Sequence, residues 1–220
     1  MGRLFDAVIN DSMDLWLEAR KVPFVTKLGE DRLSEDEFRS YIIQDSLYLN
    51  DYTKCFGMAV YKSKSVREMK VFGTLLSFVD YQENATRIKY LSSWGLDDDI
   101  VEKMEKNKAC REYTSFLLDV AENDDNDGIL MSVLPCMLGY KDVFVYLKDT
   151  YPGVMEGKYK PLVDDYTNKR YETICRNWSS YAEERFQSVS GERRKELSGI
   201  FREGSREELE FWKMAGEMNE

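Results

Sequence analysis

The sequence predicts an all-α, single-domain bundle of helices, and three observations lead to this fold class. Apolar residues recur at helical spacing along most of the 220-residue chain. No stretch of useful length alternates apolar and polar residues as a half-buried strand does. The chain holds four prolines and 13 glycines, and so few breakers favour long helices over strands and turns. We therefore expect roughly seven to nine helices in one domain that spans residues 1–220.

In the first half of the chain, local signals set the expected helix ends. Pro23 breaks or bends the chain after the first helix, and a turn follows through Gly29. Ser34 and Glu37 form a capping-box pattern, in which each side chain bonds the backbone N–H of the other. Gly95 ends a later helix, and the aspartates that follow it favour a new helix start. The helices expected here are residues 2–20, 35–61, 66–92 and a short one from residue 97.

In the second half, an acidic loop over residues 123–128 precedes a strongly apolar helix. Pro135 lies inside that helix, where it removes one backbone hydrogen bond and is expected to kink the helix beside Cys136. Ser205 and Glu208 again fit a capping box, which predicts a new helix start there. The helices expected here are residues 109–122, 129–147, 159–189, 192–202 and 205–218.

The charge of the chain limits its partners. The net charge is −10 and no dense basic run occurs, so we expect neither a nucleic-acid partner nor a membrane partner. No apolar run is long enough to span a bilayer, and no signal-peptide pattern stands near the start. The four cysteines are scattered without a CxxC pair, which is typical of reduced thiols in a cytoplasmic protein.

The chain contains no histidine. This absence excludes a histidine general base, an imidazole metal ligand and a proximal haem histidine. A metal site would have to use carboxylates or lone cysteines, and their spacing fits no zinc motif. We expect no metal site.

The stretch from Tyr41 to Tyr52 is the first candidate site. Tyr41, Asp45, Tyr48 and Tyr52 follow one another at steps of four, three and four residues, so they share one face of a helix. A carboxylate in a stripe of tyrosines can hydrogen-bond a flat polar aromatic ligand while the rings stack on it. The alternative is an amphipathic helix whose tyrosines lie at the core boundary. Because aspartate has poor helix propensity, Asp45 in mid-helix requires a partner.

Cys136 is the best candidate for a nucleophile. It follows Pro135, where backbone groups are freed, and Tyr140 lies one turn further on. Without histidine, a thiolate must be favoured by backbone N–H groups, a tyrosine hydroxyl or the substrate itself. The alternative is a buried cysteine that acts as a small apolar residue. Glu208 has its own alternative, because the capping box alone is a sufficient reason for a glutamate there.

Taken together, the motifs resemble the TenA (thiaminase II) family over nearly the whole chain. Their order and spacing, rather than any single motif, are specific. The motifs are Pro23-Phe24-Val25, Phe38-Arg39-Ser40-Tyr41, Gln44-Asp45, Tyr48-Leu49, Tyr113-Thr114-Ser115-Phe116, Leu134-Pro135-Cys136, the segment from Tyr159 to Tyr166, and Glu208-Leu209-Glu210-Phe211-Trp212. The resemblance implies the haem-oxygenase-like all-α fold, a homotetramer and a role in thiamine salvage. It also implies hydrolysis of 4-amino-5-aminomethyl-2-methylpyrimidine, of thiamine or of both to the 5-hydroxymethyl pyrimidine, with no cofactor.

The resemblance assigns roles to individual residues. Asp45 would hold the amino group and ring nitrogen of the pyrimidine, Cys136 would be the nucleophile, and Glu208 would be an acid near the ring. The cavity wall would consist of aromatic residues, with Phe211 stacking on the substrate. These wall residues are Tyr48, Tyr113, Tyr140, Tyr166 and Phe211.

Three positions depart from the family pattern. Val22 stands where histidine often precedes Pro-Phe, Leu162 replaces a tryptophan, and Ser46 follows Asp45 where an aromatic residue is common. None of these positions is a predicted catalytic residue, but Ser46 and Leu162 can reshape the cavity and so change the preferred substrate.

Two other functions compete with the hydrolase. A haem-oxygenase-like oxidase would share the fold, although the absence of histidine argues against it. A catalytically silent pyrimidine-binding or regulatory protein would keep the cavity without turnover.

Overall fold

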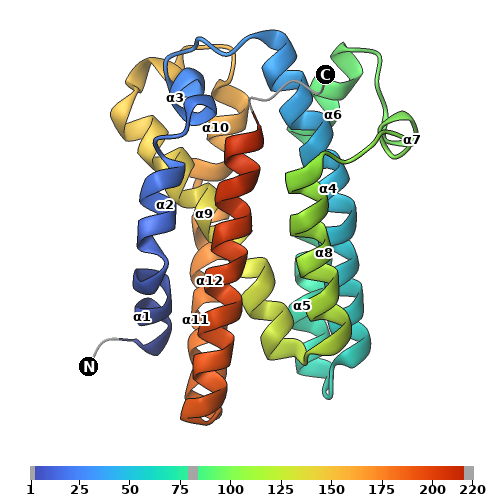
Figure 1. The fold of residues 1–220 in the computed structure, drawn as a ribbon, viewed down its shortest axis with the longest axis vertical. Coiled ribbons are helices and arrows are strands. Elements are labelled where there is room, and N and C mark those ends of the chain that lie inside the picture. The colour runs from blue at the N-terminus through green and yellow to red at the C-terminus, as the bar shows by residue number, and fades with distance from the viewer. Residues whose placement is uncertain (1–2, 79–83, 216–220) are drawn as a thin grey trace.

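The computed structural model describes residues 3–78 and 84–215, and these residues form twelve α-helices and one short 3-10 helix without any strand (Figure 1). The predicted all-α class is therefore confirmed, with more and shorter helices than expected. The helices are α1 (Leu4–Asp11), α2 (Met13–Ala19), α3 (Pro23–Gly29), α4 (Glu35–Lys62), α5 (Val66–Phe78), α6 (Asn84–Ser93), α7 (Asp98–Val101), α8 (Lys108–Asn123), α9 (Asn126–Thr150), η2 (Pro152–Met155), α10 (Lys160–Thr167), α11 (Lys169–Ser188) and α12 (Gly191–Met214).

The N-terminal region contains three short helices where one was predicted. The helix expected over residues 2–20 is interrupted at Ser12, which separates α1 from α2. Pro23 does not only end a helix; it is the first residue of α3, where its missing N–H is not needed. Gly29 ends this short helix against the Tyr151 ring, so the expected turn begins only after it, at Glu30 and Asp31, where Asp31 has a φ of 55°.

The capping signals of the first half behave as predicted. The Ser34 hydroxyl accepts from the Glu37 N–H, and the Glu37 carboxylate accepts from the Ser34 N–H, so the capping box begins α4. Gly95 has a φ of 69°, a conformation that a residue without Cβ adopts readily. Asp97 caps α7 through the Ile100 N–H. The region predicted as one helix over residues 66–92 contains α5 and α6, and residues 79–83 lie outside the described residues.

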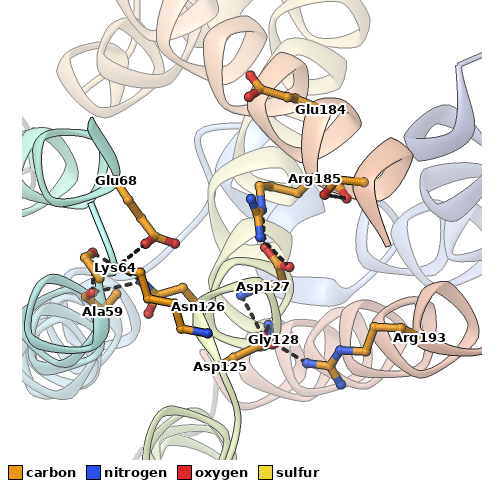
Figure 2. Close-up of polar contacts among 12 residues, drawn as sticks. Ala59, Lys64, Glu68, Asp125, Asn126, Asp127, Gly128, Glu184, Arg185 and Arg193 are labelled. Atoms are coloured by element: carbon orange, nitrogen blue, oxygen red, sulfur yellow. Dashed lines mark hydrogen bonds and ion pairs between the residues drawn. The ribbon is translucent and has the colours of Figure 1, made fainter. Parts of the chain in front are cut away.

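The predicted loop over residues 123–128 is too long. Asp125 caps α9 by accepting hydrogen bonds from the N–H groups of Asp127 and Gly128, so the helix begins at Asn126 (Figure 2). Arg193 of α12 also bonds Asp125. Two acidic residues of the predicted loop thus begin the helix: Asp125 is its N-cap, and Asp127 lies in its first turn, where the helix dipole favours a negative charge.

Two expectations in the C-terminal half are wrong. The predicted helix over residues 159–189 is divided at Asn168, whose amide donates to the Asp164 carbonyl while its side-chain oxygen accepts from the Tyr171 N–H. One asparagine therefore ends α10 and begins α11. Conversely, α12 is continuous where two helices were expected, because Ser205 caps nothing and donates to the Phe201 carbonyl one turn back.

The core is organised around α9, which packs against α12, α11, α10, α8 and α4. Figure 1 shows α4, α5 and α8 along one side and α1, α11 and α12 along the other. By length and composition α9 would be able to cross a membrane, contrary to the expectation that no such run exists, but 83% of its most apolar stretch is buried within the protein. The helix continues through Pro135, and Gly204 of α12 packs here so closely that an added Cβ would lie 2.9 Å from the proline ring. This close approach brings α12 against the segment of α9 that carries Cys136.

Candidate active site

A chain of hydrogen bonds joins α4 to α9 in the buried centre of the bundle. The Tyr140 hydroxyl donates to Asp45 Oδ1 at 3.2 Å, and the Tyr41 hydroxyl donates to the Tyr140 hydroxyl at 3.2 Å. Burial raises the pKa of Asp45 to about 6, although the positive charge of Arg87 and the Tyr140 hydrogen bond both lower it. Asp45 is thus ionised near neutral pH and has the partner that its mid-helix position requires.

Glu208 of α12 is the second buried carboxyl group. Its Oε2 accepts a hydrogen bond of 3.0 Å from the Tyr113 hydroxyl of α8, while its Oε1 has no hydrogen-bond partner. Burial raises the pKa of Glu208 to about 8; the Tyr113 hydrogen bond lowers it, and the negative charge of Asp45 raises it further. Because α12 is continuous, the capping role for Glu208 is wrong. The residue is a buried acid that holds its proton at neutral pH.

Cys136 lies on α9 beside these groups. It is 7% exposed, whereas the other three cysteines are at most 1% exposed. A negative charge on Cys136 would raise the pKa values of Tyr48 and Tyr113, on α4 and α8, and that of Tyr41. Cys136 is therefore the cysteine that stands among the candidate site residues, with the most accessible thiol of the four.

Aromatic rings enclose the two carboxyl groups. The Tyr48 ring lies 4.8 Å from the Tyr113 ring and 5.6 Å from the Phe211 ring, measured between centroids. On the other side, the Tyr140 ring lies 4.9 Å from that of Tyr166 and 4.7 Å from that of Trp212. Burial raises the pKa values of Tyr48, Tyr113 and Tyr140 well above the usual value. The tyrosine hydroxyls consequently remain protonated and can donate hydrogen bonds.

Three buried polar atoms in this region have no hydrogen-bond partner. They are the Tyr48 hydroxyl, Glu208 Oε1 and Trp212 Nε1. None of the three is isolated, because the Tyr48 hydroxyl interacts with Tyr113 and the Trp212 indole interacts with the Glu208 carboxyl group. Two donors and one carboxyl oxygen thus keep hydrogen-bonding capacity for a polar ligand, among aromatic rings that suit a flat one.

All eight residues predicted for the site are buried, and contacts or electrostatic interactions connect them across α4, α8, α9, α10 and α12. Sequence reasoning missed two members. The resemblance assigns no role to Tyr41, yet its hydroxyl belongs to the chain that ends at Asp45. Trp212 stacks on Tyr41 at 5.9 Å, and its indole interacts with Glu208. The resemblance also assigns no role to Tyr52, and its hydroxyl donates to the Val133 carbonyl in the scaffold.

The site is not assembled as a metal centre. Within residues 3–78 and 84–215, no group of three or more histidine, cysteine or acidic side chains is placed to hold a metal ion. What the site offers is a pair of carboxyl groups of different acidity, a thiol and hydroxyl donors.

Comparisons with known proteins bear on the family and the fold of this chain. The model of the TENA/THI-4/PQQC family matches residues 11–218. An aminopyrimidine aminohydrolase of Halalkalibacterium halodurans is 28% identical over 91% of this chain and 90% of the relative. One of Helicobacter pylori is 25% identical over 93% of this chain and 94% of the relative. The structure of a TenA homologue from P. horikoshii OT3 superposes with a TM-score of 0.86 at 24% identity, covering 97% of this chain and 98% of the other. The predicted haem-oxygenase-like helical fold is thereby confirmed.

Proposed function

The chain belongs to the TENA/THI-4/PQQC family, and on that premise we propose that it is a hydrolase of thiamine salvage. Its substrate is 4-amino-5-aminomethyl-2-methylpyrimidine, thiamine or both, and its product is the 5-hydroxymethyl pyrimidine. The observation that supports this proposal most is the set of unpaired polar atoms beside Asp45 and Cys136, because a flat aminopyrimidine complements them. Two relatives that cover most of the chain are named for this activity.

In the proposed complex, Asp45 accepts hydrogen bonds from the amino group and ring edge of the pyrimidine. A carboxylate that accepts two such bonds gives a strong, directional contact. The pyrimidine ring of the substrate stacks between the rings of Tyr48 and Phe211. Tyr140 holds the carboxylate of Asp45 in place through its 3.2 Å hydrogen bond.

The reaction then proceeds in two halves. Cys136 adds as a thiolate to the ring carbon next to C5 while Glu208 gives its proton to the ring, and the electron pair expels ammonia from the protonated aminomethyl group, or neutral thiazole from thiamine, at the C5 methylene. Water next adds to the exocyclic methylene and releases one proton to solvent, Glu208 takes back the ring proton, and the thiolate leaves the ring. A protonated Glu208 at neutral pH suits the first half, since burial raises its pKa to about 8.

Turnover of the two substrates tests the proposal. Purified protein is incubated with the aminomethyl pyrimidine and, separately, with thiamine, and the hydroxymethyl product is quantified by chromatography. We expect product from at least one of them and a loss of at least about 1000-fold in Cys136→Ala, because the nucleophile is removed. Cys55→Ala is the matched control: its thiol is also buried, but it donates to the Asp51 carbonyl and is not among the predicted site residues.

The outcomes separate the competing functions. Product formation by Cys136→Ala at the wild-type rate would rule out covalent catalysis. Tight binding of the hydroxymethyl pyrimidine without turnover of either substrate would instead indicate a silent binding protein. We further propose a homotetramer in the cytoplasm, as in the family it resembles, which light scattering and fractionation would check.

A further inference from the structure

A buried arginine that the proposed reaction does not use bonds the residue next to Asp45 on α4 and interacts electrostatically with Asp45. Arg87 of α6 is 7% exposed, and its Nη1 donates to Ser46 Oγ at 2.8 Å and to Asp98 Oδ1 at 2.9 Å. Ser46 is the residue that follows Asp45 on α4. Asp98 is the first residue of α7, and its side chain is 55% exposed. The guanidinium thus links a partly exposed carboxylate of α7 to the side chain that follows Asp45 on α4.

Ser46 is shaped to receive this guanidinium. Its hydroxyl donates to the Ile42 carbonyl at 2.6 Å, so its proton is committed and its lone pairs remain for Arg87. Ser46 is itself buried, at 8% exposed. A larger side chain here would occupy the space that the guanidinium fills. The small hydroxyl residue is therefore what allows a positive charge so near Asp45.

We propose that Arg87, seated on Ser46 and anchored by Asp98, is a positioning residue that holds Asp45 as a carboxylate directed at the pyrimidine edge. The inference rests on the proposed function for the identity of the ligand. It goes beyond that function in assigning control of the Asp45 charge to a residue that need not touch the substrate.

The other groups around Asp45 cannot supply this charge. Tyr140 of α9 donates one hydrogen bond, and Tyr41 donates to Tyr140. Among the described residues, Cys110 of α8 and Glu208 of α12 also interact electrostatically with Asp45, and both are neutral or negative. Asp98 of α7 is negative and pairs with Arg87. Burial raises the pKa of Asp45 to about 6, and the positive charge of Arg87 is the leading influence that lowers it.

The sign of the effect follows directly. The carboxyl is ionised above about pH 6, so at pH 7 it accepts hydrogen bonds from an aminopyrimidine. Without Arg87 its midpoint rises toward or above neutral pH, and a protonated Asp45 loses acceptor capacity at the site where the ligand needs it. Without Asp98, no negative charge offsets that of Arg87, and the titration midpoint of Asp45 falls.

The test measures the Asp45 carboxyl directly, by ¹³C NMR titration of ligand-free protein, with Asp45→Asn to assign the signal. We expect Arg87→Met to raise the midpoint by about one pH unit, and Arg87→Lys to restore most of the wild-type value. Asp98→Asn should move it by a smaller amount in the opposite direction. A merely structural role of Arg87 would lower the unfolding temperature and leave the midpoint in place.

Binding of the hydroxymethyl pyrimidine at pH 7, measured by calorimetry, gives the functional readout. We expect about twofold weaker binding to Arg87→Met than to wild type, because a rise of the Asp45 midpoint from about 6 to about 7 lowers the ionised fraction at pH 7 from about nine-tenths to about one half. Unmoved midpoints in Arg87→Met and Asp98→Asn would overturn the inference. If Arg87→Met does not fold, the direction of the Asp98→Asn shift decides, and a rise would overturn it. Shifted midpoints in a wild-type protein that neither binds nor converts pyrimidines would support the role of Arg87 and reject the proposed function.

Discussion

Two groups of acidic residues in this protein, one at a helix start with exposed Asp125 and buried Asp127 and one in the buried centre, have opposite electrostatics. At the start of α9, Asp125 accepts two backbone N–H bonds, and Asp127 accepts both Nε and Nη2 of Arg185, at 2.5 and 2.9 Å (Figure 2). We call this the α9 cap cluster. In the centre, Asp45 and Glu208 accept hydrogen bonds from tyrosine hydroxyls, and the positive charge of Arg87 acts on Asp45 without bonding it. Bonded cations neutralise the first group, whereas no cation bonds the second group among the described residues.

The pKa values reflect this contrast. Burial would raise the pKa of Asp125, but the Gly128 N–H and Arg193 outweigh it and the pKa is lowered. Burial dominates at Glu208 and raises its pKa to about 8. The α9 cap cluster leaves one buried atom unpaired, Asn126 Oδ1, whereas three unpaired atoms surround the central carboxyl groups. Acidic groups that bond cations and backbone N–H groups stabilise a helix start, whereas buried acidic groups without a bonded cation indicate a place for a ligand.

Glu208→Gln is expected to have the largest effect, on both turnover and stability, because it removes the titratable group with the higher pKa of the two central acidic residues. Turnover should fall at least about 100-fold, because the proton donor is lost. Stability should change with pH. The carboxyl has a pKa near 4.5 when unfolded and about 8 when folded, so its favourable contribution is complete below pH 4.5 and is lost as pH rises through 8. At pH 9 the variant should therefore be more stable than wild type by on the order of a few kcal/mol.

Urea unfolding at pH 5, 7 and 9 checks this expectation, with kcat measured in parallel. The difference between wild type and variant should grow with pH and be smallest at pH 5. Parallel stability curves would show that burial does not hold the proton on Glu208. Full activity in the variant would remove the acid from the mechanism.

Asp127→Ala is expected to have the next largest effect, on stability alone. It removes a two-pronged ion pair whose carboxylate is 6% exposed and leaves Arg185 without its partner. We expect a loss of about 2–3 kcal/mol in the free energy of unfolding, with kcat/KM unchanged. Arg67→Ala is the control, since its pair with Glu184 is largely exposed and should contribute less than about 1 kcal/mol. A large fall in kcat/KM in Asp127→Ala would mean that the α9 cap cluster and the site are coupled.

The fold class followed from the sequence because periodicity and few breakers are properties of the whole chain. Local signals were reliable where they stood between helices, as at Ser34 and Gly95. They failed where tertiary packing decides. Ser205 and Glu208 have the spacing of a capping box, yet packing on several sides keeps α12 continuous and the serine bonds one turn back. Asn168 divides a periodic segment because one side chain satisfies two helix ends, which periodicity does not register.

The sequence predicted which residues come together in the centre of the bundle, but not how they are hydrogen-bonded. Asp45 stood out because aspartate is unfavourable in mid-helix, and the resemblance to the TenA family supplied the other predicted residues. The hydrogen-bond partner of each residue depends on how α4, α8, α9 and α12 pack against one another. The spacing of residues along the sequence does not specify that packing. Arg87 had no local signal at all, since its relation to Asp45 exists only after α6 folds against α4.

The smallest expected effect separates two tyrosines that share one face of α4. Tyr41 donates to Tyr140, which donates to Asp45, while Tyr52 donates to the Val133 carbonyl. Tyr41→Phe should lower kcat/KM about 3- to 10-fold, because Tyr140 loses the donor that orients it, a change worth about 1 kcal/mol. Tyr52→Phe should leave kcat/KM unchanged and lower stability by about 1 kcal/mol. Steady-state kinetics and urea unfolding on both variants give the comparison. Equal effects on kcat/KM would place the Tyr41 hydroxyl in the scaffold with Tyr52, and the site would then begin at Tyr140.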